Sequence, residues 1–232
     1  YPPGSVFKIV TATAGLEEKV ITPETSFHCS GALPFGNREY LCWKKEGHGR
    51  ISLRQAIVES CDVYFYQLGL RLGVDRIAKY AFDMGLGQII GFPLGQEKPG
   101  LIPTSAWKMK RFGIPWQAGE TLSTAIGQGY NLVTPLQMAA VLSAIINGGK
   151  FYQPRIVRSI QASHGEMIKE FPPVVSKHIH VSAEILEFLR EAMWGVVNSP
   201  TGTGGRARIE GFNVSGKTGT AQVVQRREGR SD

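Results

Sequence analysis

The stretch Tyr1-Pro2-Pro3-Gly4-Ser5-Val6-Phe7-Lys8 opens the chain and joins a structural break to the start of a helix. Proline and glycine interrupt regular structure, and the apolar residues from Val6 to Leu16 then recur at helical spacing. This pattern predicts a helix that begins at Ser5. Residues three apart lie on one face of a helix, so the Ser5 hydroxyl and the Lys8 amine are expected to face one cleft. A helix cap with a solvated lysine is the alternative interpretation.

A second motif, Ser60-Cys61-Asp62, lies between two apolar stretches that are expected to be helical, Ile51 to Glu59 and Val63 to Leu72. Ser52 and Gln55 form a predicted capping box for the first of these helices. Asp62 either caps the second helix or joins Ser60 in the cleft.

A third motif, Lys217-Thr218-Gly219-Thr220, precedes a strand-like run from Ala221 to Val224. A glycine within a strand indicates that another backbone or a ligand approaches closely at Gly219. Together the three motifs supply a hydroxyl nucleophile, an amine to deprotonate it, a second hydroxyl and a cation that holds an anionic substrate. This combination is typical of acyl transfer through a serine ester.

In this order and spacing, the three motifs resemble the transpeptidase domain of penicillin-binding proteins, the serine acyltransferases that crosslink peptidoglycan and are inhibited by β-lactams. Further stretches are similar to the class B, elongation-type branch, which works in rod-shaped bacteria to maintain cell shape: Tyr1 to Ser5, Asp62 to Gln67, Gly127 to Tyr130 and Thr134 to Gln137. The resemblance extends from Tyr1 to about Val224.

The resemblance implies an α+β transpeptidase fold with two subdomains. Residues 17–149 are expected to form a mainly helical and loop subdomain, and residues 1–16 and 150–232 the helices and strands of an antiparallel sheet subdomain. Because further strands and helices flank these motifs in the family, we expect a fragment truncated at both ends, with an incomplete sheet.

The resemblance also implies roles for the motif residues. Ser5 attacks the carbonyl between the two terminal D-alanines of a stem peptide, Lys8 acts as the general base and Ser60 relays the proton to the leaving D-alanine. The family commonly has Asn where this chain has Asp62; because a carboxylate cannot donate a hydrogen bond, Asp62 is expected to pair with Lys8 or Lys217. No cofactor is expected for catalysis.

Substrate binding is expected at the third motif and at the start of the first helix. The resemblance assigns the substrate carboxylate to Lys217, Thr218, Gly219 and Thr220. It assigns the oxyanion hole to the backbone amides of Ser5 and Thr220. Gly127, Gln128 and Gly129 either line this site or form a plain turn.

The three cysteines suggest a separate metal site. Cys29, Cys42, His48 and Cys61 supply three thiolates and one imidazole, which is a complete tetrahedral zinc set. The site is expected to be structural, because Cys61 points away from the cleft if Ser60 and Asp62 face it. Free buried thiols, or one disulfide with a spare thiol, are the alternatives.

Composition and charge restrict the partners. No apolar run among the 232 residues reaches the roughly 18 needed to span a bilayer. The net charge of +7 comes from scattered basic residues without interleaved aromatic residues, so nucleic acid is not expected as a partner. The resemblance implies stem peptides and β-lactams as ligands and a membrane-embedded glycan polymerase as partner. It places the intact, anchored protein on the periplasmic or extracytoplasmic face of the cytoplasmic membrane.

Two rival functions stay open. A class D β-lactamase or a β-lactam sensor has the same kind of motif set but differs in the fate of the acyl group. A non-catalytic, zinc-braced binding module, in which the serine is idle, is the other alternative.

The remaining stretches predict ordinary elements. Helices are expected at Asp75 to Met84, after the capping residues Thr134-Pro135, and at Ala183 to Val197. Gly87 to Gly119 is expected to be a long loop, in which Ser105 and Lys108 form a second Ser-x-x-Lys on a basic surface. Phe151 to Gln161 is expected to be a strand.

Overall fold

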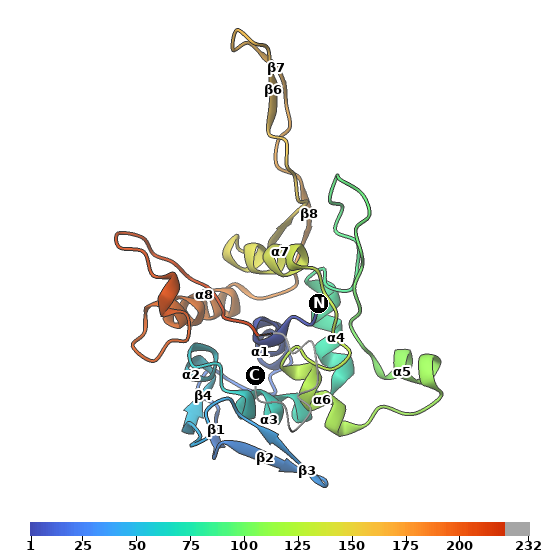
Figure 1. The fold of residues 1–232 in the computed structure, drawn as a ribbon, viewed down its shortest axis with the longest axis vertical. Helices are drawn as coiled ribbons and strands as arrows, with labels where there is room; N and C mark the ends of the chain where they lie inside the picture. Colours follow the sequence, from blue (N-terminus) through green and yellow to red (C-terminus); the bar gives the residue numbers. More distant parts are fainter. Residues whose placement is uncertain (221–232) are drawn as a thin grey trace, which may run out of the picture.

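A computed structural model describes residues 1–220, and its helices pack around one buried central helix (Figure 1). This helix, α1 (Lys8–Glu17), follows the short 3-10 turn η1 (Gly4–Phe7), and every side chain from Lys8 to Leu16 is buried. Four helices pack against α1: α2 (Leu53–Val58), α3 (Asp62–Leu72), α4 (Val74–Asp83) and α8 (Ala183–Asn198). The predicted helix at Ser5 is confirmed, with Ser5 in the 3-10 turn.

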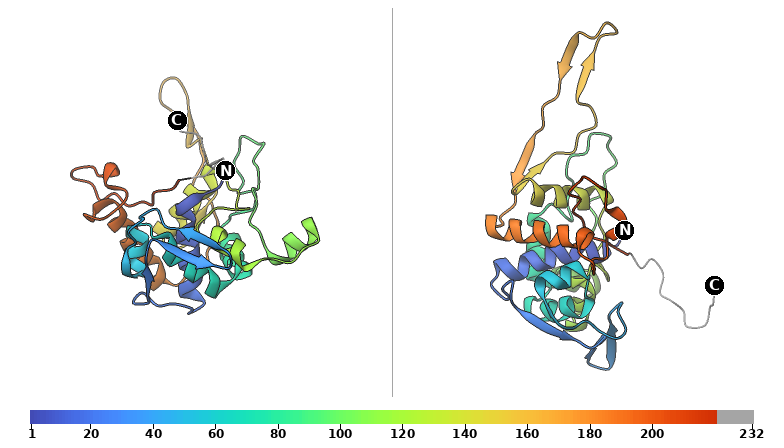
Figure 2. Two further views of the ribbon diagram at one scale, coloured as in Figure 1. Left: turned by 60° about the horizontal axis from the view of Figure 1, so that its bottom comes forward. Right: turned by 90° about the vertical axis from the view of Figure 1, so that its left-hand side faces the viewer.

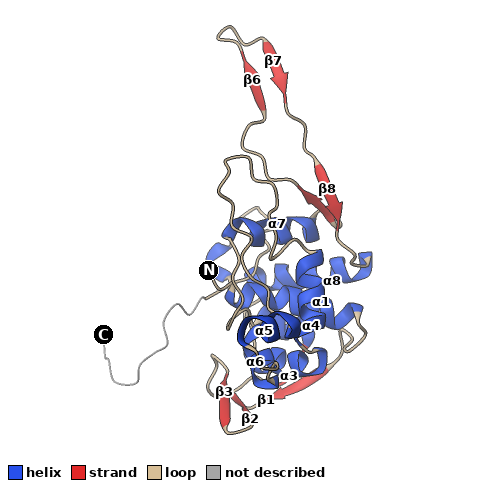
Figure 3. Cartoon of the chain, turned by 90° about the vertical axis from the view of Figure 1, so that its right-hand side faces the viewer, coloured by secondary structure: helices blue, strands red, loops and turns tan. Residues whose placement is uncertain are grey.

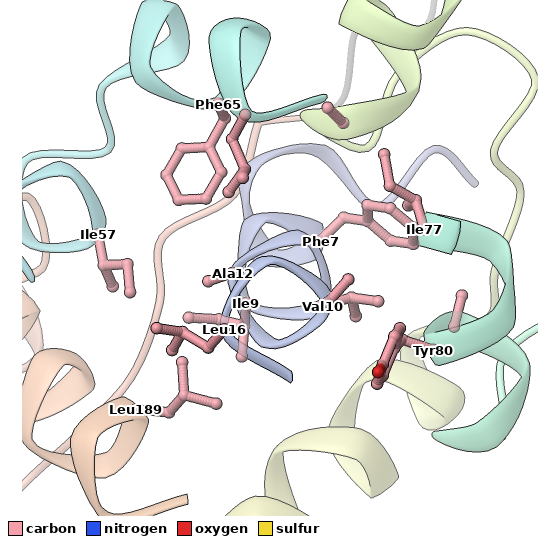
Figure 4. Packing of buried hydrophobic residues seen from close by; sticks show 14 of the residues in the cluster. Phe7, Ile9, Val10, Ala12, Leu16, Ile57, Phe65, Ile77, Tyr80 and Leu189 are labelled. Carbon is pink, nitrogen blue, oxygen red and sulfur yellow. The ribbon is translucent and has the colours of Figure 1, made fainter. Parts of the chain in front are cut away.

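The core is aliphatic and aromatic on all sides of α1, as Figure 4 shows. Ile9 and Leu16 face Leu189 of α8, and Val10 faces Tyr80 of α4. Each such buried side chain contributes roughly 1.5–3 kcal/mol to folding relative to its exposed state. Because α1 is enclosed, the turn that carries Ser5 is held on a rigid support.

The strands form four separate antiparallel pairs within residues 1–220. The pairs are β1 (Ser26–Cys29) with β4 (Gly49–Ser52), β2 (Ala32–Phe35) with β3 (Arg38–Leu41), β5 (Lys150–Tyr152) with β8 (Val175–His178), and β6 (Ser159–Gln161) with β7 (Met167–Glu170). Figure 3 shows β1 to β3 and β6 to β8 at opposite ends of the helical body, and Figure 2 shows the β6–β7 hairpin projecting away from it. The predicted α+β class is confirmed.

Side-chain caps set the beginnings of several helices where the sequence predicted them. Ser52 caps α2, Thr134 and Gln137 form a capping box for α7 (Pro135–Ile146), and Ser182 caps α8. The side chain that caps α3 is Cys61, so the capping interpretation of Asp62 is wrong: Asp62 is the first residue of the helix.

The predicted long loop at Gly87 to Gly119 is wrong in its second half. Residues Ser105–Phe112 form α5, capped by the Thr104 hydroxyl, and the next helix, α6, spans Ala118–Ala125. Lys108 is buried and its Nζ lies 2.5 Å from Glu120 Oε2. The expected basic surface loop is therefore a helix held by a buried ion pair.

The predicted strand from Phe151 to Gln161 is two short strands, β5 and β6. Pro154 lies between them and lacks the backbone N–H that a continuous ladder needs. Lys217 to Thr220 is in no strand of the described chain, and the strand-like run Ala221 to Val224 lies outside the described residues. A second 3-10 turn, η2, spans Gly205–Ala207, and no described helix has the length and hydropathy to cross a bilayer.

Candidate active site

Ser5 lies at the edge of a cleft of about 620 Å³, on the turn that leads into α1. The preceding Gly4 has φ +58° and donates its N–H to Gly127 O at 2.9 Å. A Cβ on Gly4 would stand 2.3 Å from Thr220 O, so only glycine lets the third motif approach this turn. The cleft is lined by all three motifs: Ser5, Ser60, Asp62, Thr218, Gly219 and Thr220 are among its residues.

Lys8 is fully buried beneath the cleft and its ammonium is completely paired. Nζ donates to Ser60 O at 2.8 Å, to Ser60 Oγ at 3.2 Å and to Asp62 Oδ1 at 2.7 Å. An ammonium has three N–H groups, so these bonds use all of them. Asp62 is thus the partner of Lys8, and none of the hydrogen bonds in the described chain joins Lys8 to Ser5.

Ser60 stands between the two lysines. Its Oγ accepts from Lys217 Nζ at 2.8 Å as well as from Lys8, and its backbone has φ +55°, which is unusual for a residue with a Cβ. Because both amines donate to Oγ, the hydroxyl proton of Ser60 is free to point into the cleft. The strained backbone is typical of functional sites, where the surrounding structure enforces the conformation.

Lys217 has a strongly perturbed pKa. Desolvation is the main cause that lowers the pKa of Lys217 to about 7, and the Lys8 charge acts in the same direction, whereas Asp62 opposes them. Near neutral pH, Lys217 is therefore present in both its protonated and its neutral form, and such a perturbed group in a cleft is a candidate functional residue.

The third motif lies close to the turn that carries Ser5. A Cβ on Gly219 would stand 2.7 Å from Val6 Cγ2 and 3.3 Å from Pro3 O, which confirms the close approach predicted for this glycine. Gln128 Nε2 donates to Thr220 O at 3.1 Å. The segment after α6 therefore contacts both Gly4 and Thr220, and Gln128 of this segment lines the cleft.

Three further cleft residues lie outside the three motifs, although Tyr66 belongs to the stretch Asp62 to Gln67 that contributed to the resemblance. Trp43 donates its backbone N–H to Asp62 Oδ2 at 3.0 Å and its indole N–H to Glu59 O at 2.9 Å. Thr203 follows α8 and Tyr66 belongs to α3. Their positions depend on packing between segments, although the tryptophan beside a predicted metal ligand was a clue.

The cysteines and His48 converge beside the cleft: Cys29 ends β1, Cys42 and His48 lie between β3 and β4, and Cys61 caps α3. One ligand atom from each of Cys29, Cys42, His48 and Cys61 lies within 4.8 Å of the others. His48 Nδ1 is 3.5 Å from Cys29 Sγ and 3.6 Å from Cys42 Sγ. All three cysteines are free thiols, so the disulfide alternative is wrong for this structure.

Hydrogen bonding within the cluster favours the thiolate form of Cys42. A hydrogen bond from the Cys61 thiol lowers the pKa of Cys42 to about 5, and the same bond raises the pKa of Cys61. His48 Nε2 is buried without a hydrogen-bond partner, and the nearest carboxylate oxygen, Glu59 Oε2, lies 3.6 Å away.

Comparisons with known proteins agree with this geometry. The model of the penicillin-binding protein transpeptidase domain family matches residues 1–232. The peptidoglycan D,D-transpeptidase MrdA of Haemophilus influenzae is 38% identical over 232 residues, a match that covers 98% of this chain and 35% of the relative. The chain therefore spans about a third of that relative's length.

Solved structures show the same likeness. PBP2 of Helicobacter pylori, in a complex with MreC, superposes with a TM-score of 0.84 at 36% identity, over 96% of this chain and 40% of that one. PBP2 of Pseudomonas aeruginosa, in a complex with WCK 5153, superposes with a TM-score of 0.83 at 34% identity, over 96% of this chain and 50% of that one.

Proposed function

This chain belongs to the penicillin-binding protein transpeptidase family, and we propose that it carries the active site of an elongation-type peptidoglycan D,D-transpeptidase that works through a serine acyl-enzyme. One observation supports this most strongly: Ser60 Oγ accepts from both Lys8 and Lys217 in the cleft that Ser5 lines. Two amines around one hydroxyl, beside a second hydroxyl, form a route for a proton between a nucleophile and a leaving group.

In the acylation step, Ser5 Oγ attacks the carbonyl carbon between the two terminal D-alanines of a stem peptide, and Lys8 takes the Ser5 proton, a role that requires the Lys8 amine to be unprotonated at the moment of attack. The backbone amides of Ser5 and Thr220 stabilise the oxyanion. The carbon–nitrogen bond then breaks, and Ser60 passes its proton to the departing amine of D-alanine and receives in turn the proton that Lys8 took from Ser5. Asp62 holds the Lys8 ammonium in place between these events.

In the second step, an amine of a neighbouring stem peptide attacks the Ser5 ester. The new amide is the crosslink, the carbon–oxygen bond to Ser5 breaks, and the proton that the attacking amine loses passes to Ser5 Oγ. Lys217, with Thr218, Gly219 and Thr220, binds the carboxylate of the donor peptide, and β-lactams use the same site because they present a carboxylate beside a strained amide.

Labelling by a fluorescent penicillin tests this function. We expect wild-type protein to form a stable adduct that mass spectrometry locates on Ser5, and Ser5→Ala to form none. Rapid release of hydrolysed penicillin would instead support the β-lactamase alternative. Folded wild-type protein without any adduct would support the non-catalytic alternative.

We also propose that Cys29, Cys42, His48 and Cys61 bind a structural zinc ion. The donor set fits, because tetrahedral zinc holds sulfur and nitrogen ligands roughly 3.5 Å apart, and the two Sγ–Nδ1 separations are 3.5 and 3.6 Å. Cys61 links the site to Ser60 and Asp62, so the metal would brace the second motif. Metal analysis should give one zinc per chain, and Cys42→Ser should lose it; stoichiometric zinc in that variant, or none in the wild type, would contradict the site.

The partners follow from the reaction. Stem peptides lie outside the cytoplasmic membrane, so the intact protein is placed on the extracytoplasmic face and works with a membrane-embedded glycan polymerase. The similar H. pylori protein forms a complex with MreC. Co-purification of the intact protein with a glycan polymerase tests this assignment, and separate migration of the two in detergent would contradict it.

A further inference from the structure

Thr203 reaches the candidate active site from a part of the chain that contains none of the three motifs. It lies in the loop between α8 and η2 and lines the same cleft as Ser5 and Ser60. Its Oγ1 is 2.7 Å from Thr218 Oγ1, the shortest hydrogen bond made by either hydroxyl. Thr218 is one of the residues that the proposed function assigns to the substrate carboxylate.

The loop that carries Thr203 is fixed at several points. Thr203 N donates to Val58 O at 3.3 Å, and Gly204 N donates to Val196 O at 2.8 Å. A Cβ on Gly202 would stand 2.4 Å from Val196 O, so the loop passes against the end of α8 with no space for a side chain. Thr203 is therefore placed by the ends of α2 and α8, two elements of the core.

Either hydroxyl can be the donor in this pair, and a ligand in the cleft selects the direction. Each threonine hydroxyl has one proton and can accept up to two hydrogen bonds. The only other acceptor of the Thr203 hydroxyl among the described residues is Val58 O at 3.5 Å, which is much weaker than Thr218 Oγ1 at 2.7 Å. When an anion occupies the cleft, the arrangement in which Thr203 donates to Thr218 leaves the Thr218 proton free to bind the anion.

We propose that Thr203 is a positioning residue for the carboxylate site: it orients the Thr218 hydroxyl so that this group donates to an anionic ligand. The inference rests on the proposed function and adds a specificity determinant to it. Lys217 supplies the positive charge that attracts the carboxylate. Thr203 acts through Thr218 and sets the direction in which the Thr218 hydroxyl points. A hydrogen bond to an ionised acceptor is about twice as strong as a hydrogen bond between neutral groups. Ligands with a free carboxylate therefore gain the most binding energy from the oriented Thr218 hydroxyl.

The experiment compares acylation by benzylpenicillin with acylation by its methyl ester, which lacks the negative charge. We expect Thr203→Val to lower the second-order acylation rate for benzylpenicillin about fivefold, as for one lost hydrogen bond, and to leave the rate for the ester within about twofold. Thr203→Ser should restore the preference for the acid. Thr201→Val is the matched control, because Thr201 is exposed in the same loop and its hydroxyl bonds Gln55 outside the cleft.

The possible outcomes distinguish a failure of this inference from a failure of the proposed function on which it rests. Wild-type acylation with an unchanged acid-to-ester ratio in Thr203→Val would overturn the role of Thr203 alone. Equal losses with acid and ester would also overturn it, since a merely structural role slows both. A wild-type protein that neither compound acylates would overturn the proposed function and, with it, this inference.

Discussion

Lys8 Nζ lies 2.7 Å from Asp62 Oδ1, and the other oxygen of the same carboxylate accepts the backbone N–H of Trp43 at 3.0 Å. The side chain of Lys8 has 0% exposure and that of Asp62 has 14%. Asp62 therefore connects the buried amine of the first motif to the loop that carries Cys42. The carboxylate is a structural link between the candidate active site and the cysteine cluster.

Replacing this carboxylate tests the link. In Asp62→Asn the buried ammonium of Lys8 loses its counter-charge, so we expect the free energy of unfolding to fall by about 3 kcal/mol. Urea denaturation measures it. Glu191→Gln is the control, since the Arg54–Glu191 pair is about half exposed and should contribute less than about 1 kcal/mol. Equal midpoints for Asp62→Asn and wild type would contradict the expectation.

The lowered pKa of Lys217 predicts how stability depends on pH. The pKa of Lys217 is about 7 in the folded protein and 10.5 in its ordinary state. Between these values the unfolded chain binds more protons at this residue, so its contribution to the free energy of unfolding rises with pH. Urea denaturation from about pH 7 to about pH 9.5 should show this increase in wild type and a smaller one in Lys217→Met. Parallel pH curves for the two proteins would contradict the assignment.

Glu59 is expected to support the proposed zinc ion through His48. Its Oε2 lies 3.6 Å from His48 Nε2, on the side of the ring opposite the thiols. Carboxylates in this position orient a ligating histidine, so Glu59→Gln should weaken zinc binding about 10- to 100-fold in a chelator competition. Glu46→Gln, on the exposed loop between Cys42 and His48, should leave the affinity unchanged. Equal zinc affinities in the two variants would show that Glu59 does not support the zinc site.

Lys108 is expected to anchor α5 through its buried ion pair. Lys108→Ala would leave Glu120 without its charge partner, although Glu120 Oε2 still accepts from Gln117 N at 2.8 Å. We expect a loss of about 3 kcal/mol in unfolding free energy. The exposed neighbour Lys110→Ala should change it by less than about 0.5 kcal/mol. A loss that small in Lys108→Ala would show that the ion pair does not hold the helix.

Gly127 is expected to require glycine for a reason beyond its backbone angle. Its φ is +74°, and a Cβ would stand 2.2 Å from Gly4 O, whereas Gly129 has φ +69° and its nearest neighbour would be 3.4 Å away. Both alanine variants should lose about 1–2 kcal/mol from the left-handed backbone. Only Gly127→Ala should also displace the Ser5 turn and lower penicillin labelling, by about 100-fold. Equal labelling of the two variants would contradict the steric argument.

Helix beginnings were predictable because their causes are local. The hydroxyls of Ser52, Thr134 and Ser182 each bond a backbone N–H three residues onward, so a short window of sequence contains both partners. The prediction of a loop over residues 87–119 was wrong for the opposite reason, because the cause of its second half lies in contacts distant in sequence. Lys108 forms a buried ion pair with Glu120, which lies on the following helix. Composition alone predicts that a lysine in a proline-rich stretch is exposed on the surface.

Residue types and their spacing are enough to predict which chemistry is present: the order of the three motifs, the turn before Ser5 and the complete set of candidate sulfur and nitrogen ligands can all be read from the chain. Only the tertiary structure decided which groups meet. Lys8 bonds Ser60 and Asp62 across 52 and 54 residues, and Lys217 bonds Ser60 across 157. Such contacts are set by how the core packs around α1, because side chains that are far apart in the chain acquire a mutual distance only when the helices that carry them are buried against one another.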